Sequence, residues 1–156
     1  MTEDTYPRQH ARTRHFWLGR PSSFRISPDG SSILFCRSRT GSDPITMLWR
    51  FDVDSGREEL LVDPATLVEE GSGELPPEEQ ARRERARETS EGIVRFTADR
   101  ELTRAVFDLA GRLFLADLRS GGARELPVQQ PAVDPRLDPT GRHVAYVSSG
   151  SLRIIR

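Results

Sequence analysis

The residues with the clearest capacity for chemistry lie in residues 77–92, which carry Arg82, Arg83, Arg85 and Arg87. A planar guanidinium can donate two hydrogen bonds to carbonyl or carboxylate oxygens, which suits binding of a peptide or an acidic ligand. The stretch has the composition of a helix without an apolar face. Two interpretations stay open: a solvated or disordered charged linker, or an arm whose arginines face a cavity.

Other kinds of chemistry have little support in the sequence. Net charge is -1 and the arginines alternate with glutamates, so we expect no nucleic-acid partner. The chain has no Gly-x-Ser-x-Gly nucleophile motif, so we expect no catalytic residue in it. His10, His15 and His143 are scattered and Cys36 is the only cysteine, so we expect no metal site. No glycine loop precedes a helix as in phosphate-binding motifs, and we expect no cofactor.

Composition predicts a globular chain. Its 156 residues are 35% hydrophobic and 30% charged, enough for one domain with a core. The first residues lack the apolar segment of a signal peptide, and no run approaches the roughly 20 apolar residues that span a bilayer. We therefore expect a cytoplasmic protein with no membrane partner.

The sequence on either side of the arginines repeats itself. Leu48-Trp-Arg-Phe-Asp-Val-Asp-Ser-Gly56 aligns with Leu113-Phe-Leu-Ala-Asp-Leu-Arg-Ser-Gly121. Arg25-Ile-Ser-Pro-Asp-Gly30 aligns with Arg136-Leu-Asp-Pro-Thr-Gly141 in the same way. Short apolar strands separate these turns. Repeats of four short strands every 40 to 50 residues are typical of β-propeller blades.

The repeat predicts an all-β fold: a partial β-propeller of antiparallel four-stranded blades, about two and a half in number. We expect an N-terminal segment at residues 1–20, with a short strand at residues 16–18, and an incomplete propeller at residues 21–156. The blades are predicted at residues 23–62, at 93–126 and from 133 onward, the third without its last strand. One charged helical insertion at about residues 63–92 separates the first two blades. This pattern predicts the front part of a larger protein.

Several motifs together resemble one enzyme family. They are Arg83-Glu-Arg-Ala-Arg87, Gly92-Ile93, the turn Ser27-Pro-Asp-Gly30, and the segments Leu60-Leu-Val-Asp-Pro64 and Asp134-Pro-Arg136. The arrangement resembles the N-terminal β-propeller of dipeptidyl peptidase IV-like serine peptidases in the prolyl oligopeptidase superfamily. The resemblance implies an exopeptidase that releases N-terminal dipeptides. In that family the propeller covers a C-terminal α/β-hydrolase domain holding the catalytic serine, aspartate and histidine.

The resemblance also assigns roles to residues. It implies that Arg83 binds a carbonyl of the peptide substrate, with Arg82, Arg85 and Arg87 as alternates. The family's amine-binding glutamate pair falls beyond residue 156. Without the hydrolase domain this chain is expected to be inactive, and we expect it to bind a peptide substrate only together with that domain. The resemblance also allows a homodimer of the full-length enzyme. Two alternatives remain: a non-enzymatic propeller-type binding module with Ser-Pro-Asp-Gly repeats, and a truncated gene product without activity.

Overall fold

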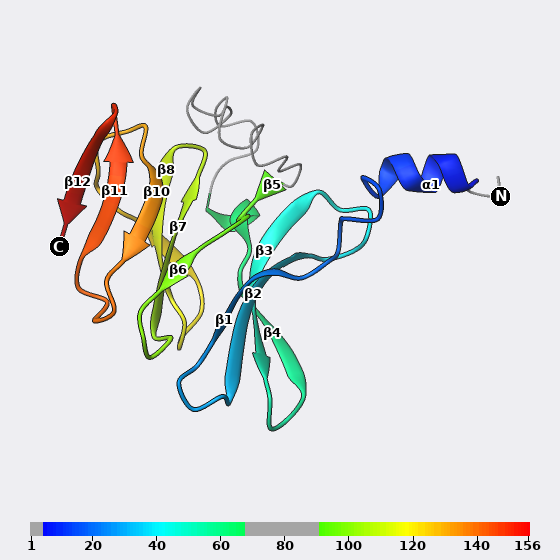
Figure 1. The fold of residues 1–156 in the computed structure, drawn as a ribbon, viewed down its shortest axis with the longest axis horizontal. Helices are drawn as coiled ribbons and strands as arrows, with labels where there is room; N and C mark the ends of the chain where they lie inside the picture. Colours follow the sequence, from blue (N-terminus) through cyan, green and yellow to red (C-terminus); the bar gives the residue numbers. More distant parts are fainter. Residues whose placement is uncertain (1–4, 68–90) are drawn as a thin grey trace.

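The computed structural model describes residues 5–67 and 91–156 and shows three antiparallel sheets stacked side by side (Figure 1). The first sheet contains β1 (Ser22–Ile26), β2 (Ser32–Ser38), β3 (Ile45–Asp52) and β4 (Arg57–Val62), with β5 (Glu91–Gly92) added on β3. The second contains β6 (Thr97–Ala98), β7 (Arg104–Leu109), β8 (Arg112–Asp117) and β9 (Ala123–Glu125). The third contains β10 (Val133–Leu137), β11 (Val144–Ser148) and β12 (Ser151–Ile155).

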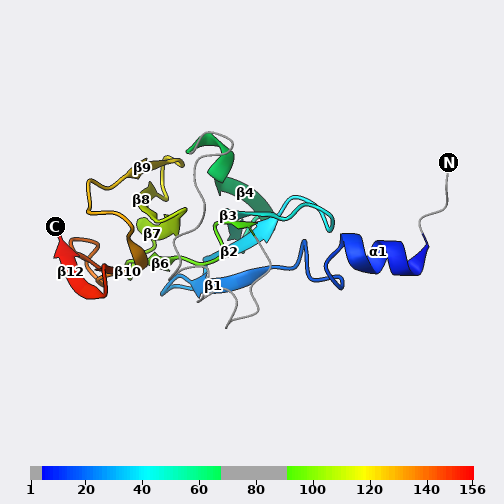
Figure 2. The same cartoon turned by 90° about the horizontal axis from the view of Figure 1, so that it is seen from above.

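The three sheets are the three predicted blades. Each is a meander in which consecutive strands pair antiparallel, and the third has three strands, as the sequence repeat predicts. Figure 2, seen from above, shows the sheets following one another around an arc. The fold class is therefore confirmed: the chain is mostly β and forms part of a propeller.

The blades also repeat in register. Ile26 of β1 pairs with Ile33 of β2, and Leu137 of β10 pairs with Val144 of β11. Both pairs follow the same irregularity, at which Ser23 and Asp134 adopt positive φ angles of 54° and 52°. Because the bulge recurs at the same position in two blades, it is a feature of the repeat and not of one strand alone.

Two apolar layers hold the blades together. Between the first and second blades, Phe107 and Phe114 stack at a centroid distance of 5.7 Å against Leu34 and Leu48. Between the second and third blades, Tyr146 joins a separate buried cluster. Burying each large side chain is worth about 1.5–3 kcal/mol, so the interfaces between blades are the main source of stability.

Aspartates close the turns between strands. Asp29 accepts hydrogen bonds from Ser27 Oγ at 2.6 Å and from the Ser31 amide at 3.0 Å. These bonds favour the charged carboxylate and lower the pKa of Asp29 from 3.8 to about 2. In the third blade the turn aspartate is Asp138, which aligns with Ser27 rather than with Asp29, and bonds from Thr140 and the His143 amide hold its pKa well below its usual value.

The N-terminal segment differs from the prediction of a strand. Residues 6–12 form the helix α1 (Tyr6–Arg12), with proline in its first turn, where its missing amide is harmless. Three consecutive residues, 14–16, then adopt positive φ angles, which breaks any strand through residues 16–18. Only Leu18 of that cluster is buried, whereas Phe16 and Trp17 are 50% and 59% exposed. In the described ranges, no helix is long and apolar enough to cross a membrane.

Candidate functional site at the base of the arginine insertion

The four predicted ligand arginines, Arg82, Arg83, Arg85 and Arg87, lie outside the described residues, which resume at Glu91. The structure therefore places none of them. It does show how both ends of the insertion attach to the first blade, and these attachments set the point from which the insertion starts and to which it returns.

The outgoing end is fixed by a capped turn. The 3₁₀ helix η1 (Pro64–Thr66) begins after Asp63, whose Oδ1 accepts a hydrogen bond from the Ala65 amide at 3.0 Å. The other carboxylate oxygen of Asp63 receives a hydrogen bond from Arg39 Nη2 at 2.8 Å. Pro64 itself is buried. The chain thus leaves β4 along a defined path rather than from a loose end.

The returning end is held by a glycine in close contact with β3. Gly92 has a φ of +76°, and a Cβ placed there would lie 2.5 Å from the Thr46 carbonyl oxygen and 3.1 Å from Pro64 Cγ. The Glu91 amide donates to the Pro44 carbonyl oxygen at 2.9 Å, and the Ile93 amide donates to that of Thr46 at 2.8 Å. Gly92 lies in β5, a short strand parallel to β3.

The two ends lie next to each other and to the N-terminal segment. A Cβ built on Gly92 would come within 3.1 Å of Pro64 Cγ, so the two ends meet at the base of the insertion. Arg14, just after α1, forms an ion pair with Glu91 at 3.1 Å. This pair is largely exposed and contributes little, typically 0–1 kcal/mol, but it shows that the N-terminal segment borders the base. Figure 1 shows η1 and β5 at the same end of the first blade.

From this base the chain passes directly into the edge strand of the second blade. Ile93, Val94 and Phe96 are buried, at 0%, 8% and 8% exposure. Ser23 Oγ in β1 donates to the Val94 carbonyl oxygen at 3.1 Å, and Thr97 Oγ1 accepts from the Leu137 amide at 2.9 Å. The first strands of the three blades, β1, β6 and β10, are thus linked edge to edge by hydrogen bonds. The first strands of successive blades lie in this way around the axis of a propeller, so we call β1, β6 and β10 the axis strands.

Charged side chains gather on these axis strands. Arg136 Nη2 donates to Asp134 Oδ1 at 2.9 Å, and Arg95 Nη2 lies 3.2 Å from the same oxygen. With Asp108 they line a small pocket of about 20 Å³, room for one water molecule. A pocket of this size does not hold a peptide, so the cluster primarily links the second and third blades. The Arg136 side chain is 61% exposed, so part of its guanidinium group faces solvent.

Sequence reasoning did not assign a role to this cluster. Arg95 lies beyond the arginine-rich core of residues 82–87, and the Asp134-Pro-Arg136 motif entered only as part of the family resemblance. The signal that identifies the cluster is its position in the repeat. Ser23, Arg95 and Asp134 are equivalent residues of the three blades, each two residues before the paired residues Arg25, Thr97 and Arg136. That correspondence follows from the repeat but needs the strand register.

The remaining candidate residues behave as structural groups. Cys36 is fully buried in the first core. His10 and His15 stack on each other at 4.3 Å, a contact that their sequence spacing did not suggest. In the described parts of the chain, no three histidine, cysteine or acidic side chains gather to hold a metal ion.

Comparisons with known proteins agree with the fold. No protein-family model matches the chain. The solved structures similar to it include one reported for two prolyl endopeptidases, with a TM-score of 0.55 and 16% identity over 88% of this chain and 19% of that one. A putative TolB from Agrobacterium tumefaciens gives 0.53 and 16%, over 87% and 45%. TolB from Acinetobacter baumannii gives 0.50 and 18%, over 87% and 28%.

These likenesses identify the class of protein. The chain forms part of a β-propeller, of the kind found in TolB and in prolyl endopeptidases. At this level of identity the likeness shows the fold alone. The chain also spans less than half the length of each of these proteins.

Proposed function

We propose that this chain is the N-terminal propeller portion of a dipeptidyl peptidase IV-like serine exopeptidase of the prolyl oligopeptidase superfamily, active in the cytoplasm. In this role the chain supplies a substrate-binding arginine, Arg83, with Arg82, Arg85 and Arg87 as alternates. A peptide is its ligand, and the catalytic serine, aspartate and histidine belong to an α/β-hydrolase domain that these residues do not include. No cofactor or metal enters the chemistry.

One observation carries this proposal: the base of the insertion is closed and fixed. Asp63 and Gly92 attach its two ends to the first blade, and Ile93 leads straight into the axis strand of the second. Residues 68–90 thus start and finish at the same end of the first blade, next to β3 and β4. An arm rooted there suits presentation of arginine to a ligand over the propeller better than a linker between independent domains does. The fold likeness to prolyl endopeptidases supports the same role.

The chemistry expected of Arg83 is recognition, not bond breaking. A guanidinium that donates to a backbone carbonyl of the substrate fixes the peptide's position relative to the hydrolase serine. Loss of one charge-assisted hydrogen bond costs roughly 1.5–3 kcal/mol, which corresponds to about a 10- to 100-fold change in an equilibrium constant.

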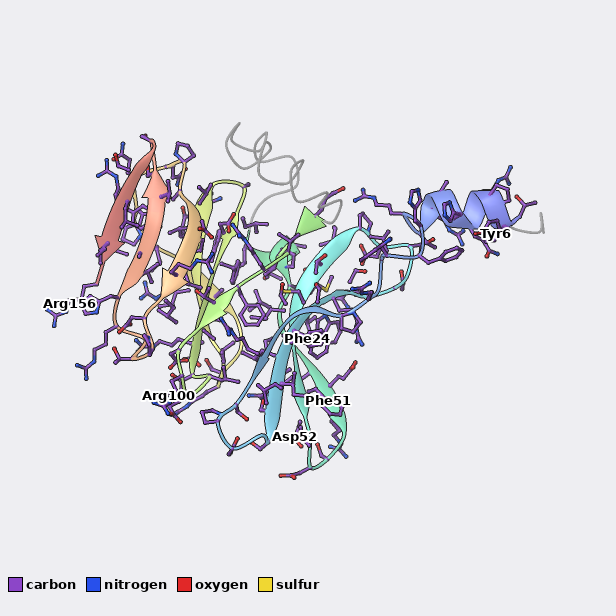
Figure 3. All side chains as sticks on the ribbon, in the orientation of Figure 1. Tyr6, Phe24, Phe51, Asp52, Arg100 and Arg156 are labelled. Carbon is purple, nitrogen blue, oxygen red and sulfur yellow. The ribbon has the colours of Figure 1, made fainter. Side chains whose placement is uncertain are left out.

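The test is made on the polypeptide that joins residues 1–156 to the hydrolase domain. Arg83→Ala is expected to raise KM for a dipeptide-releasing substrate by about 10- to 100-fold. Arg100→Ala is the matched control, since Arg100 is exposed in the β6–β7 turn at the far end of the strands (Figure 3). An unchanged kcat/KM in the Arg83 variant would exclude Arg83 as a substrate ligand and move the search to its alternates.

A non-enzymatic binding module is the second candidate function. It is favoured by the likeness to TolB, a structure of which this chain covers as much as 45%. The coding sequence after Arg156 separates the two: a Gly-x-Ser-x-Gly motif within the next several hundred residues supports the peptidase, and further blades followed by a stop support the module.

A further inference from the structure

The axis strands carry an excess of positive charge. Figure 2 shows β10, β6 and β1 in a row along one side of the blades, with β4 and β9 on the opposite side. β1 contributes Arg25, residues 93–98 contribute Arg95, and β10 contributes Asp134 and Arg136. Three arginines and one aspartate give these segments a net charge of +2, whereas the whole chain carries -1. Positive charge is therefore concentrated around the axis.

Arg25 and Arg136 occupy the same position in the register of the first and third blades, and Thr97 takes it in the second. Thr97 Oγ1 accepts a hydrogen bond from the Leu137 amide of β10 at 2.9 Å. A side chain at this position is thus directed toward the axis strand of the next blade. By this equivalence Arg25 lies on the side of the first blade that the second blade borders.

The exposure of these two arginines does not depend on the number of blades. Arg25 is exposed although the second blade lies on its side. Its equivalent Arg136 is 61% exposed, and a blade beside it is expected to leave it as open as the second blade leaves Arg25. None of the ion pairs between described residues involves Arg25. Two guanidinium groups are therefore open to a ligand at this position.

One carboxylate already binds at this surface. Arg136 Nη2 donates to Asp134 Oδ1 at 2.9 Å, and Arg95 Nη2 lies 3.2 Å from the same oxygen. Asp108 lines the same pocket but is only 5% exposed, so its carboxylate does not face a ligand. With Asp108 included, this cluster is balanced, and the net positive charge at the axis comes from Arg25. Asp134 shows that guanidinium groups of two blades converge on a carboxylate.

The aspartates that follow the axis strands are occupied by their own turns. Asp29 accepts from Ser27 Oγ and the Ser31 amide, and Asp99 accepts from the Thr103 and Arg104 amides. Asp138 accepts in the same way from the two amides of residues 142 and 143. These carboxylates bind groups of their own turns and not the arginines of the axis strands.

We propose that the axis of this propeller binds an acidic peptide, with the guanidinium groups of Arg25 and Arg136 on its carboxylates. β1, β6 and β10 each begin their sheet, so one edge of each is not paired within its own blade. Backbone groups on such an edge suit an extended peptide, and planar guanidinium groups suit its carboxylates. Because the two arginines lie on the first and third blades, a segment with several carboxylates contacts both more readily than one small anion does.

This proposal concerns residues of the described sheets and does not rest on the peptidase role. An acidic peptide is equally a substrate of a peptidase or the ligand of a binding module, so either proposal can fail without the other.

Binding is tested by isothermal titration calorimetry of residues 1–156 with acetyl-pentaglutamate amide, and acetyl-pentaglutamine amide is the uncharged comparison. We expect the acidic peptide to bind at least about 10-fold more tightly at low salt, and to lose affinity as salt rises, because salt screens exposed charges. Equal affinities of the two peptides, or an affinity that salt does not change, would overturn the proposal.

Two variants test which arginines bind the peptide. Arg25→Gln and Arg136→Gln are each expected to weaken binding of pentaglutamate by about 5- to 10-fold, since each removes one charge-assisted contact at an exposed site. Arg119→Gln is the matched control, because it removes the same charge from an exposed arginine in the β8–β9 turn, outside the axis strands. Circular dichroism verifies that the variants are folded. An equal loss in Arg119→Gln would show attraction by overall charge and contradict the site.

Two other anions serve as competitors for pentaglutamate. Inorganic phosphate is expected to displace it only at concentrations on the order of 100-fold higher, because phosphate lacks the linked carboxylates that contact two arginines at once. A short oligothymidylate is expected to bind more weakly than pentaglutamate. Displacement by an equal concentration of phosphate would assign the site to a small anion, and tighter binding of the oligothymidylate would assign it to nucleic acid; either result would overturn the acidic peptide as its ligand.

Discussion

Substitution of Gly92 by alanine tests whether the insertion is held as closely to the first blade as the structure shows. The change costs energy in two ways. At a φ of +76° an L-residue pays roughly 1–2 kcal/mol for its Cβ. The new Cβ would also lie 2.5 Å from the Thr46 carbonyl oxygen, a backbone atom of β3 that has to shift. Overpacking of this kind typically costs about 1–3 kcal/mol. We therefore expect Gly92→Ala to lower the free energy of unfolding by about 3 kcal/mol.

Gly30→Ala is the matched control for this experiment. Gly30 has nearly the same φ, +77°, but a Cβ there would meet nothing within 4 Å. This substitution should cost only the backbone strain, about 1–2 kcal/mol. Urea unfolding followed by circular dichroism, at one chain concentration for all variants, measures the difference. Equal losses for the two variants would refute the close approach of Gly92 to β3, and with it the closed base of the insertion.

Other predictions concern the core and the turns. Phe107 has a fully buried ring, so Phe107→Ala is expected to lower the free energy of unfolding by about 3–5 kcal/mol. Phe16 has a half-exposed ring, so Phe16→Ala should lower it by less than about 1 kcal/mol. Similar losses for the two variants would contradict the assigned core. The pKa of Asp29 is depressed to about 2, so its stabilising contribution is present above about pH 4 and is lost as pH falls toward 2. Asp29→Asn should therefore lower the melting temperature at pH 7, and the difference from the unsubstituted protein should shrink between pH 4 and pH 2. Asp54→Asn, in an exposed turn, serves as its control; a difference independent of pH would contradict the role of the Asp29 carboxylate.

Much of the fold could be predicted from the sequence because the blades repeat. The alternation of apolar residues and the Asp-Gly and Ser-Gly turns act within a few residues, so they mark strand boundaries directly. β2 begins shortly after the Ser27-Pro-Asp-Gly30 turn, and β11 begins shortly after the aligned turn that ends at Gly141. The burial of β2 on both faces also follows from its sequence, since Leu34 and Cys36 lie on one face, Phe35 lies on the other, and all three are apolar and buried.

Other features depend on contacts between distant residues and were not predictable in this way. β5 exists because residues 91–92 return to β3, about 45 positions earlier in the chain. The helix α1 was missed because its sequence has no apolar stripe; its rings contact each other and Phe16 instead. The cluster of Arg95, Asp134 and Arg136 forms only when two axis strands lie side by side.

The candidate site was also predictable only in part. The arginines that the sequence singled out were chosen by composition and resemblance, and Arg83 remains a prediction because residues 68–90 lie outside the described ranges. The attachment of the insertion became visible only in the structure, through Asp63, Gly92 and Arg39. The local sequence thus suggested which arginines bind a ligand, whereas tertiary contacts showed how the insertion that carries them is attached to the first blade.

The most direct test of the proposed function is a dipeptide-release assay on the polypeptide that joins residues 1–156 to the hydrolase domain. The substrate is a chromogenic Gly-Pro amide with a free amine, and a copy with a blocked amine serves as the comparison. We predict release of the Gly-Pro dipeptide from the free-amine substrate only, with a KM at least 10-fold higher in Arg83→Ala. Absence of release, or equal cleavage of the blocked substrate, would contradict the assignment to a dipeptidyl peptidase.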